Sequence, residues 1–296
     1  MRARGRSWLA LPVAVALAGA PRTIPAAEPD VCIAVSSGDV RAVADAAERA
    51  LGVPAHRLDV RDPGERAALA SRCGRLIIAV GSEALRAAAE AAPRAPLVHV
   101  MAPDALPSGR AGVLPDADPR RIVETLQKLA PGVRRIGAVF NPALTGGFVA
   151  EAAAAARERG IELVTLPVSS VRDAVRAFRR FEKEIEVDAL WLLPDGTATV
   201  QETVYYALEL AHWRRLPVIG LSRWYVASGA LFALLPRPES CGTAAGELGQ
   251  QLLRGAAPSG SVRAREYALF VSQRAAARLG LRVPRQVLES AEQVLP

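Results

Sequence analysis

Three consecutive residues can form hydrogen bonds with a ligand: Asp195 through its carboxylate, Gly196 through a backbone that no side chain covers, and Thr197 through its hydroxyl. They come just after residues 189–193, an unbroken apolar run of the length expected for a strand buried on both faces. Ligands of open α/β sheets bind at the carboxyl ends of parallel strands. The stretch therefore predicts hydrogen bonding to a small polar solute. The alternative is that Asp195 only shapes the turn, while Thr197 or Thr199 caps the next helix.

Motifs for covalent or phosphoryl chemistry are missing from the sequence. It contains no G-x-S-x-G elbow, P-loop or G-x-G-x-x-G, and no histidine stands beside an acid at a predicted strand end. The three histidines, His56, His99 and His212, are scattered, so we predict neither a metal site nor a cofactor. The predicted strand ends are rich in hydrogen-bonding groups and poor in bases, which favours a binding protein over an enzyme.

Apolar runs and helical periodicity alternate through the first hundred residues after the N-terminal segment. The order is strand, helix, strand, helix, strand, helix, strand, which is typical of a parallel sheet with helices on both faces. The predicted strands are residues 31–36, 56–60, 76–80 and 96–100.

A stretch rich in proline and glycine, residues 102–119, interrupts this rhythm and predicts a crossing between two lobes. A second strand and helix series follows, with predicted strands at residues 135–140, 162–167, 189–193 and 216–220. We predict an α/β fold of two doubly wound parallel-sheet lobes joined by a hinge.

The C-terminal part of the chain is too short for a third domain. It contains predicted strands at 230–235 and 267–271 and helices at 239–253, 273–279 and 284–291. We expect each lobe to take one strand and at least one helix. The predicted boundaries are 28–110 plus 228–258 for lobe I and 111–227 plus 259–296 for lobe II.

The formal charge of +7 does not predict a nucleic-acid partner. Residues 1–27 carry four arginines and no acid, and the remaining +3 is spread along the chain among acidic residues. These first residues have the arginine-rich start, the apolar run (8–20) and the small residues of a cleavable export signal. The apolar run is too short to span a bilayer comfortably, so we expect a periplasmic protein.

Three cysteines, Cys32, Cys73 and Cys241, cannot all pair within one chain. Cys32 and Cys73 lie at the amino ends of two predicted strands, which would be close if those strands are neighbours. An oxidising compartment then permits a disulfide between them; the alternative is a pair of buried thiols.

Four stretches resemble one known family, the periplasmic substrate-binding proteins of ABC importers with the type I fold, in the group that includes tryptophan- and tyrosine-binding members. The resemblance is clearest over residues 111–296. The stretches are Pro131 to Gly137 with Phe140-Asn141-Pro142; Val187 to Gly196; Leu216 to Ile219; and Ala276 to Leu281 with Val283-Pro284 and Val287-Leu288.

The resemblance implies capture of a small solute between two lobes that close about a hinge, delivery to a membrane permease, and a monomer. A ligand-sensing module for a membrane receptor, or an exported enzyme, is the alternative. Where the family often has an acid, this chain has Arg223 and Trp224, which suit a carboxylate or an aromatic group. The ligand-binding residues we expect at the strand ends are Ser36, Ser37, Gly81, Ser82 and Met101 in lobe I and Asn141, Thr145, Gly146, Asp195, Thr197, Ser222, Arg223 and Trp224 in lobe II.

Overall fold

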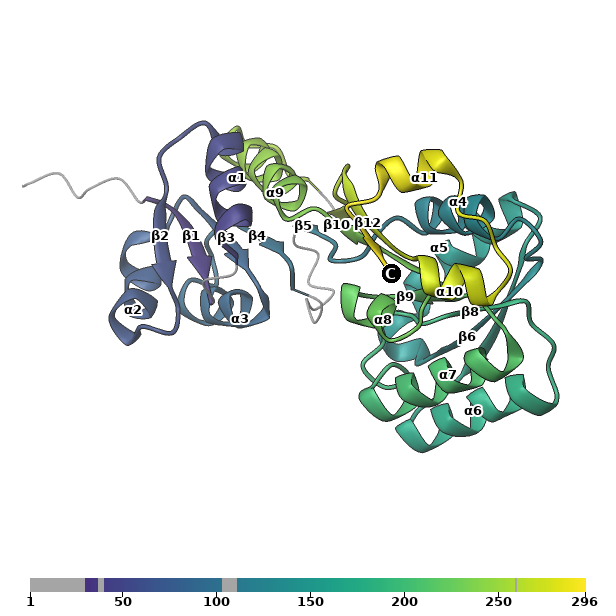
Figure 1. Cartoon of the computed structure of the whole chain (residues 1–296). Coiled ribbons are helices and arrows are strands. Elements are labelled where there is room, and N and C mark those ends of the chain that lie inside the picture. The colour runs from purple at the N-terminus through teal and green to yellow at the C-terminus, as the bar shows by residue number, and fades with distance from the viewer. Residues whose placement is uncertain (1–29, 37–39, 103–110, 259) are drawn as a thin grey trace, which may run out of the picture.

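Two separate sheets, each covered by helices, form the two lobes of the molecule (Figure 1). The computed structural model describes residues 30–36, 40–102, 111–258 and 260–296. The predicted signal (1–27) and Ser37 therefore lie outside the described residues. The predicted strands and helices are found in their predicted order, with additional short strands at 112–113, 261–262 and 293–295 and a short helix at 223–227. The predicted α/β fold of two parallel-dominated sheets is confirmed.

The first sheet has the strand order β11-β5-β4-β3-β1-β2, with every neighbouring pair parallel. Alternate residues of its strands enter two apolar clusters: Val31 and Ile33 pack on the side of α1 and α9, Cys32 and Ala34 on the side of α2 and α3. This double burial explains the unbroken apolar runs. Its elements are β1 (Val31–Val35), α1 (Arg41–Leu51), β2 (His56–Asp59), α2 (Pro63–Arg72), β3 (Leu76–Val80), α3 (Ser82–Ala91), β4 (Leu97–Val100), β5 (Gly112–Val113), α9 (Pro238–Leu253) and β11 (Ser261–Val262).

The second sheet has the order β13-β12-β10-β9-β8-β6-β7 and is parallel except where β12 pairs with β10. Helices α4, α5 and α10 pack on one face, and α6 and α7 on the other. Its elements are α4 (Pro119–Leu129), β6 (Arg135–Phe140), α5 (Pro142–Glu158), β7 (Glu162–Pro167), α6 (Val171–Lys183), β8 (Ala189–Trp191), α7 (Gln201–Arg214), β9 (Val218–Gly220), α8 (Arg223–Ala227), β10 (Phe232–Pro236), β12 (Tyr267–Ser272), α10 (Gln273–Arg278), α11 (Arg285–Ser290) and β13 (Gln293–Leu295).

The lobe boundaries differ from those predicted at three strands. β10 was expected in lobe I but belongs to the second sheet, where Phe232 is in register with Ile219 of β9. β5 and β11 were expected in lobe II but extend the first sheet, where Ser261 pairs with Gly112. An apolar run predicts a strand but not its partners, and two-residue strands carry no periodic signal. Lobe I therefore receives α9 and β11 from the C-terminal part, and lobe II the rest.

Three segments join the lobes within the described residues: 114–118 after β5, Arg237 between β10 and α9, and 263–266 after β11. Backbone hydrogen bonds tie them together, from Leu114 N to Val262 O (2.8 Å) and from Arg237 N to Glu266 O (2.9 Å). Because the chain leaves each sheet from the carboxyl end of β5, β10 or β11, both sheets turn their carboxyl edges toward this junction. Those edges are where α/β sheets bind ligands.

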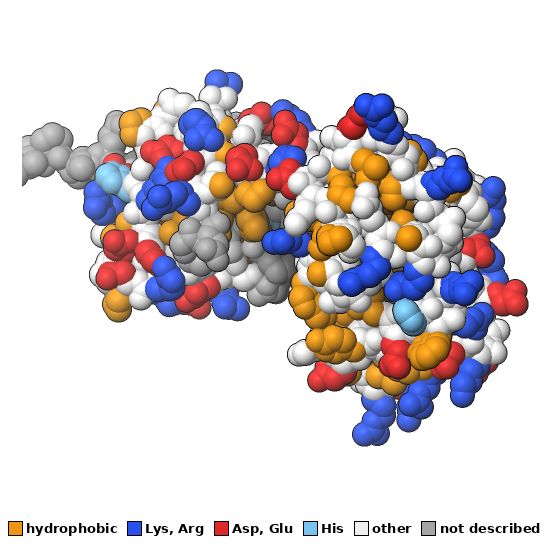
Figure 2. Space-filling model, viewed as in Figure 1, with side chains coloured by type: hydrophobic (Ala, Val, Ile, Leu, Met, Phe, Trp, Pro, Cys, Tyr) orange, Lys and Arg blue, Asp and Glu red, His pale blue; other side chains and the backbone are white. Residues whose placement is uncertain are grey.

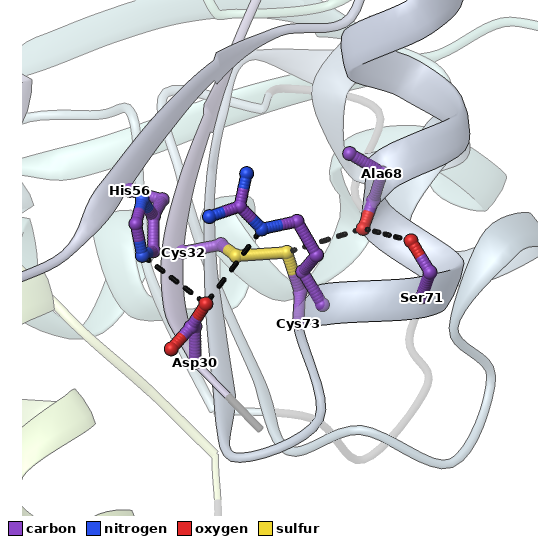
Figure 3. Close-up of a disulfide and its surroundings, with 7 residues drawn as sticks. Asp30, Cys32, His56, Ala68, Ser71 and Cys73 are labelled. Carbon is purple, nitrogen blue, oxygen red and sulfur yellow. Dashed lines mark hydrogen bonds and ion pairs between the residues drawn. A yellow bond between two sulfur atoms is a disulfide. The ribbon is translucent and has the colours of Figure 1, made fainter. Parts of the chain in front are cut away.

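A disulfide joins Cys32 of β1 to Cys73 at the end of α2, with their Cα atoms 5.6 Å apart (Figure 3). Of the two alternatives left by the sequence, the disulfide is the one found. The neighbouring strands β1 and β3 are in register from Val31 opposite Leu76, which brings the two cysteines close. Beside the disulfide, Oδ2 of Asp30 lies 3.1 Å from Nε2 of His56. Cys241 is a buried free thiol.

Helices α1 and α9 lie in close contact although about two hundred residues separate them. A Cβ atom placed on Gly242 would lie 2.2 Å from the carbonyl oxygen of Val43, and one on Gly246 would lie 2.4 Å from that of Ala47. Only glycine allows the α9 backbone to approach α1 this closely. None of the helices in the described ranges has the length and apolarity needed to cross a membrane.

Candidate functional site

Asp195 follows β8 at the carboxyl edge of lobe II, where its carboxylate is almost completely buried. Its Oδ1 accepts hydrogen bonds from the backbone N–H groups of Thr197 (2.8 Å) and Ala198 (2.7 Å). Its Oδ2 accepts from the backbone N–H of Asn141 (2.7 Å) and the hydroxyl of Thr145 (2.5 Å). A carboxylate has about four lone-pair directions, and here all four are used.

Asp195 therefore holds two loops of the protein together, and the expectation that it binds the solute needs correction. Asp195 was selected because it is an acid that follows a predicted strand, and the structure confirms that it follows β8. What the sequence did not show is that the loop after β6, some fifty residues earlier, supplies two of its four donors. The predicted cap also differs: α7 begins at Gln201, beyond Thr197 and Thr199, and Thr203 Oγ1 accepts a hydrogen bond from Val200 N instead.

The other polar groups of this edge belong to the same network. Asn141 caps α5 through its Oδ1, which accepts from Ala143 N, and its Nδ2 donates to Thr197 Oγ1 (3.0 Å). Thr145 is buried against Asp195. The structure thus brings Asn141, Thr145, Asp195 and Thr197 together, as the sequence predicted, but in contact with one another. Gly146 lies one residue further on in α5, and a Cβ there would meet no atom within 4 Å.

Arg223 and Trp224 are the exposed groups of the same edge. Both lie in α8, directly after Ser222 and the end of β9. Trp224 is 44% exposed, and its ring contacts the edges of Tyr205 and Tyr225 at centroid distances of 5.6 and 5.2 Å. Among the described residues no acid pairs with the Arg223 guanidinium. These two side chains keep the capacity to bind a carboxylate and an aromatic group.

Lobe I presents smaller groups at its own carboxyl edge. Ser36 follows β1, and its Oγ lies 3.0 Å from the position that a Cβ of Gly81 would take. Gly81 follows β3 with φ of +94°, a conformation that favours glycine. Ser82 begins α3 beside it, and Met101 follows β4 with φ of +53° and is 39% exposed. The edge therefore offers hydroxyls and a thioether, with no charge among these residues.

A small cavity of about 50 Å³ opens at the carboxyl ends of β8, β9 and β10, beside the first crossing segment. Most of the side chains that line it are apolar, including Phe148 of α5 and Trp191 of β8, whose rings meet edge to face at 5.8 Å, but polar atoms line it as well. Leu221 and Pro236 contribute from the other strand ends. The one charged residue among those that line it is Asp116, which lies in the crossing segment.

The sequence analysis missed Asp116, and its environment is unusual for an acid. Burial raises the pKa of its carboxyl to about 6, Arg263 opposes the shift and Glu151 adds to it. Arg263 lies in the neighbouring crossing segment, and its Nη1 is 2.7 Å from Oε2 of Glu151 in α5. The one available signal was position: Asp116 stands between two prolines in the stretch predicted to cross between lobes. Cross-lobe segments carry no strand-end pattern, so nothing marked it as part of the site.

Larger hollows lie elsewhere on lobe II. One of about 390 Å³ is lined by Tyr205, His212 and Trp213 of α7 and by Arg278 of α10. Figure 2 shows hydrophobic side chains over α7 and α8 on this face. No strand end contributes to this hollow, so the strand-edge position favours the smaller cavity over it. A more open hollow of about 440 Å³ also lies at strand ends, beside Asn141 and Pro167. Within the described residues no group of three or more histidines, cysteines or acids is arranged to hold a metal ion.

Two parallel-dominated α/β lobes, three crossing segments and a polar junction define the type I periplasmic-binding fold. A family model described as ABC transporter substrate binding protein matches residues 73–295, well over half of the chain. The chain belongs to the ABC transporter substrate-binding protein family. A search of curated proteins finds no match.

Several solved structures are similar along almost the whole chain. The ABC domain from Streptococcus pneumonia in complex with L-Trp is 19% identical, with 90% of this chain and 99% of that chain covered and a TM-score of 0.59. The ligand-free, open structure of a substrate-binding protein with adhesive properties from Clostridium difficile is 17% identical, with 90% and 98% covered and a TM-score of 0.65. A conserved domain protein from Vibrio cholerae is 19% identical, with 90% and 99% covered and a TM-score of 0.58. These identities show a shared fold.

Proposed function

We propose that this chain is an exported receptor that captures a small solute at the junction of its lobes and delivers it to the permease of an ABC importer. The observation that carries the proposal is that both sheets turn their carboxyl edges to one junction, where Arg223, Trp224 and the Asp116 cavity have groups left for a ligand. The hydrogen-bonded loops around Asp195 give that edge a fixed geometry. Fixed polar groups beside an apolar cavity are typical of small-molecule sites.

Two independent observations support an exported location. Residues 1–27 have the pattern of a cleavable export signal. The Cys32–Cys73 disulfide is a feature of proteins that fold in oxidising compartments. N-terminal sequencing of the protein from a periplasmic extract tests the export step, with cleavage expected next to Ala20, Ala26 or Ala27. An uncleaved N-terminus in the cytoplasmic fraction would contradict it.

Ligand capture is tested by a thermal-shift screen of the mature protein as a monomer. The panel contains amino acids, amines, aromatic acids, nucleobases, sugars and small carboxylates. A ligand at about 100 times its Kd adds roughly 2.7 kcal/mol to the free energy of unfolding. We expect one chemical class to raise the Tm, and Arg223→Ala or Trp224→Ala to reduce that shift without lowering the Tm of the empty protein.

Matched controls are available on the same lobe. Trp213→Ala removes a tryptophan that is 76% exposed at the far end of α7, and Arg282→Ala removes an exposed arginine away from the junction. Both controls should keep the ligand shift. If no compound shifts the Tm, and mass spectrometry of the native protein finds no bound solute, ligand capture is wrong.

Delivery to an importer needs a separate measurement. Uptake of the ligand that the screen identifies, labelled with ¹⁴C, is compared in cells with and without the gene. Loss of uptake supports an importer receptor. Unchanged uptake together with loss of a cellular response to the ligand would instead favour the sensing alternative.

A further inference from the structure

Asp116 and Asp195 both lie at the lobe II side of the junction, but their carboxylates differ in how many hydrogen bonds they accept from the protein. All four acceptor directions of Asp195 are used by groups of the protein. Among the described residues no side chain or backbone group donates a hydrogen bond to the carboxylate of Asp116, and no cation lies within 4 Å of it. Asp116 is half-buried, and its unpaired carboxylate is not among the fully buried polar groups that lack a partner. It therefore reaches water from the cavity wall and is free to pair with a charged group of a ligand.

The nearest charged groups do not satisfy Asp116. Arg263, in the crossing segment after β11, directs Nη1 to Glu151 Oε2 at 2.7 Å. Its Nε is buried and has no hydrogen-bond partner in the described chain. Arg263 is thus close enough to influence Asp116 but is held by a different acid. Asp116 lines a cavity whose other lining residues are uncharged, with Phe148 and Trp191 among them.

We propose that Asp116 binds the protonated amine of the solute, so that the ligand is a small organic cation or zwitterion with an apolar part. This inference rests on the proposed function and specifies the ligand class for it. The cavity of about 50 Å³ has room for a few heavy atoms, roughly an aminomethyl group. An ammonium group there gives the carboxylate a partner through a charge-assisted hydrogen bond, which is stronger than one between neutral groups.

Arg223 and Trp224 complement this assignment from the end of β9. They suit a carboxylate and an aromatic group, as the sequence indicated, and no acid in the described part of the chain pairs with Arg223. Asp116 supplies that acid from the crossing segment. Leu221, which lines the cavity, is only two residues from Arg223, so a single molecule of amino-acid size could contact both ends of the site.

The test uses isothermal titration calorimetry of the mature protein at pH 7.5 with two matched sets of probes. One set is L-tryptophan, tryptamine and indole-3-propionate; the other is L-leucine, isoamylamine and isocaproate. We expect at least one amine-bearing member to bind, the member without an amine to bind at least about 30-fold more weakly, and Asp116→Asn to remove that difference. Glu202→Gln, which neutralises an exposed acid in the first turn of α7, should bind within about twofold of wild type.

The pH dependence separates ligand contact from a purely structural role. The probe amine keeps its charge between pH 7.5 and 5, whereas Asp116 becomes protonated near pH 6, with Arg263 and Glu151 as the charged groups acting on it. Affinity for the amine should therefore fall as the pH drops below about 6 in wild type and Glu202→Gln, and stay level in Asp116→Asn. Urea unfolding of Asp116→Asn confirms that the variant is folded.

The outcomes distinguish this inference from the function on which it rests. Equal affinity for probes with and without the amine, or an Asp116→Asn variant that binds amines as tightly as wild type, would overturn the assignment of Asp116. Binding of sugars, nucleobases or simple carboxylates in the thermal-shift panel, with none of the six probes binding, would also overturn it while leaving the solute receptor intact. If neither the probes nor the panel bind, both proposals fail.

Discussion

The backbone N–H of Asn141 donates a 2.7 Å hydrogen bond to Oδ2 of Asp195, which stands fifty-four positions later in the chain. This bond joins the loop after β6 to the loop after β8 at the carboxyl edge of lobe II. Thr145 donates a second hydrogen bond to the same oxygen. The edge that borders the junction is therefore built on a buried acid that fixes the geometry of its neighbours.

Asp195→Asn should destabilise lobe II, because one of the two oxygens becomes an NH₂ group that faces N–H or O–H donors. Leaving buried donors without an acceptor costs about 1–3 kcal/mol. Urea unfolding monitored by tryptophan fluorescence measures the loss, since Trp191 is buried in this lobe. Glu202→Gln makes the same chemical change at an exposed position and should stay within about 0.5 kcal/mol of wild type. Equal stability of the two variants would contradict the role of Asp195.

The Cys32–Cys73 disulfide should contribute about 4 kcal/mol, as expected from the chain entropy of a closed loop of this length. We expect the double variant Cys32→Ala/Cys73→Ala to lose that amount in urea unfolding. Dithiothreitol should lower the stability of wild type by a similar amount and leave the double variant unchanged. A reductant effect of the same size in the double variant would assign it to something other than this disulfide. Cys241 should react with a thiol reagent only on unfolding, because it is buried.

His99 predicts a loss of stability at acid pH. It is buried in β4, no described group hydrogen-bonds its Nδ1, and burial lowers its pKa. The unfolded chain therefore binds a proton at higher pH than the folded one. Its stabilising contribution is complete above the ordinary pKa of about 6.5 and is lost as the pH falls toward the lower folded-state pKa, by at most about 1.4 kcal/mol per pH unit.

His99→Phe isolates this contribution, because phenylalanine keeps a ring of similar size that does not titrate. We expect the free energy of unfolding of wild type to fall more steeply than that of the variant between pH 7 and 5. His212→Phe, at an exposed position, should follow wild type. Asp116 acts with the opposite sign, since its raised pKa makes the folded state bind a proton first as the pH drops below about 6. Asp116 is present in wild type and in both variants, so its effect on the free energy of unfolding cancels when they are compared. Parallel slopes in all three would contradict the prediction for His99.

A pair of helical glycines should respond to alanine in opposite directions. In Gly242→Ala the new Cβ would lie 2.2 Å from the Val43 carbonyl oxygen, which forces α9 away from α1 and costs about 1–3 kcal/mol. In Gly147→Ala the new Cβ meets no atom within 4 Å, and alanine should stabilise α5 by about 0.5–1 kcal/mol. Chemical denaturation of both variants measures the two effects. Stabilisation by Gly242→Ala would contradict the close helix contact.

Most of the fold could be predicted from the sequence because its strands are buried on both faces. Runs such as Leu76–Val80 have no polar interruption, and turn residues mark where each one ends. Strands β5 and β11 have two residues each and leave no such pattern. The apolar run at β10 predicted a strand correctly, but its assignment to a sheet depends on hydrogen bonding to β9 and β12, which the local sequence does not encode.

The candidate site was predictable in its location and less so in the roles of its residues. Asn141, Asp195 and Ser222 lie after β6, β8 and β9 at one edge of the sheet, as predicted, and the binding of a solute at this edge stays a prediction. Whether a side chain there faces the solute depends on how many of its hydrogen bonds the protein itself uses, and for Asp195 the protein uses all of them. Asp116 shows the converse, since an acid in an irregular crossing segment acquires its environment only from the assembled lobes.

The contact between α1 and α9 also determines when lobe I can complete its folding during synthesis of the chain. As residues leave the ribosome, β1 to β5 emerge before lobe II, but α1 alone covers one face of their sheet until α9, residues 238–253, has been made. The N-terminal sequence of lobe I therefore cannot complete the packing of that face. The export proposed above requires a chain that is still unfolded when it crosses the membrane. The late arrival of α9 keeps the first half of this chain incomplete while the second half is still being synthesised.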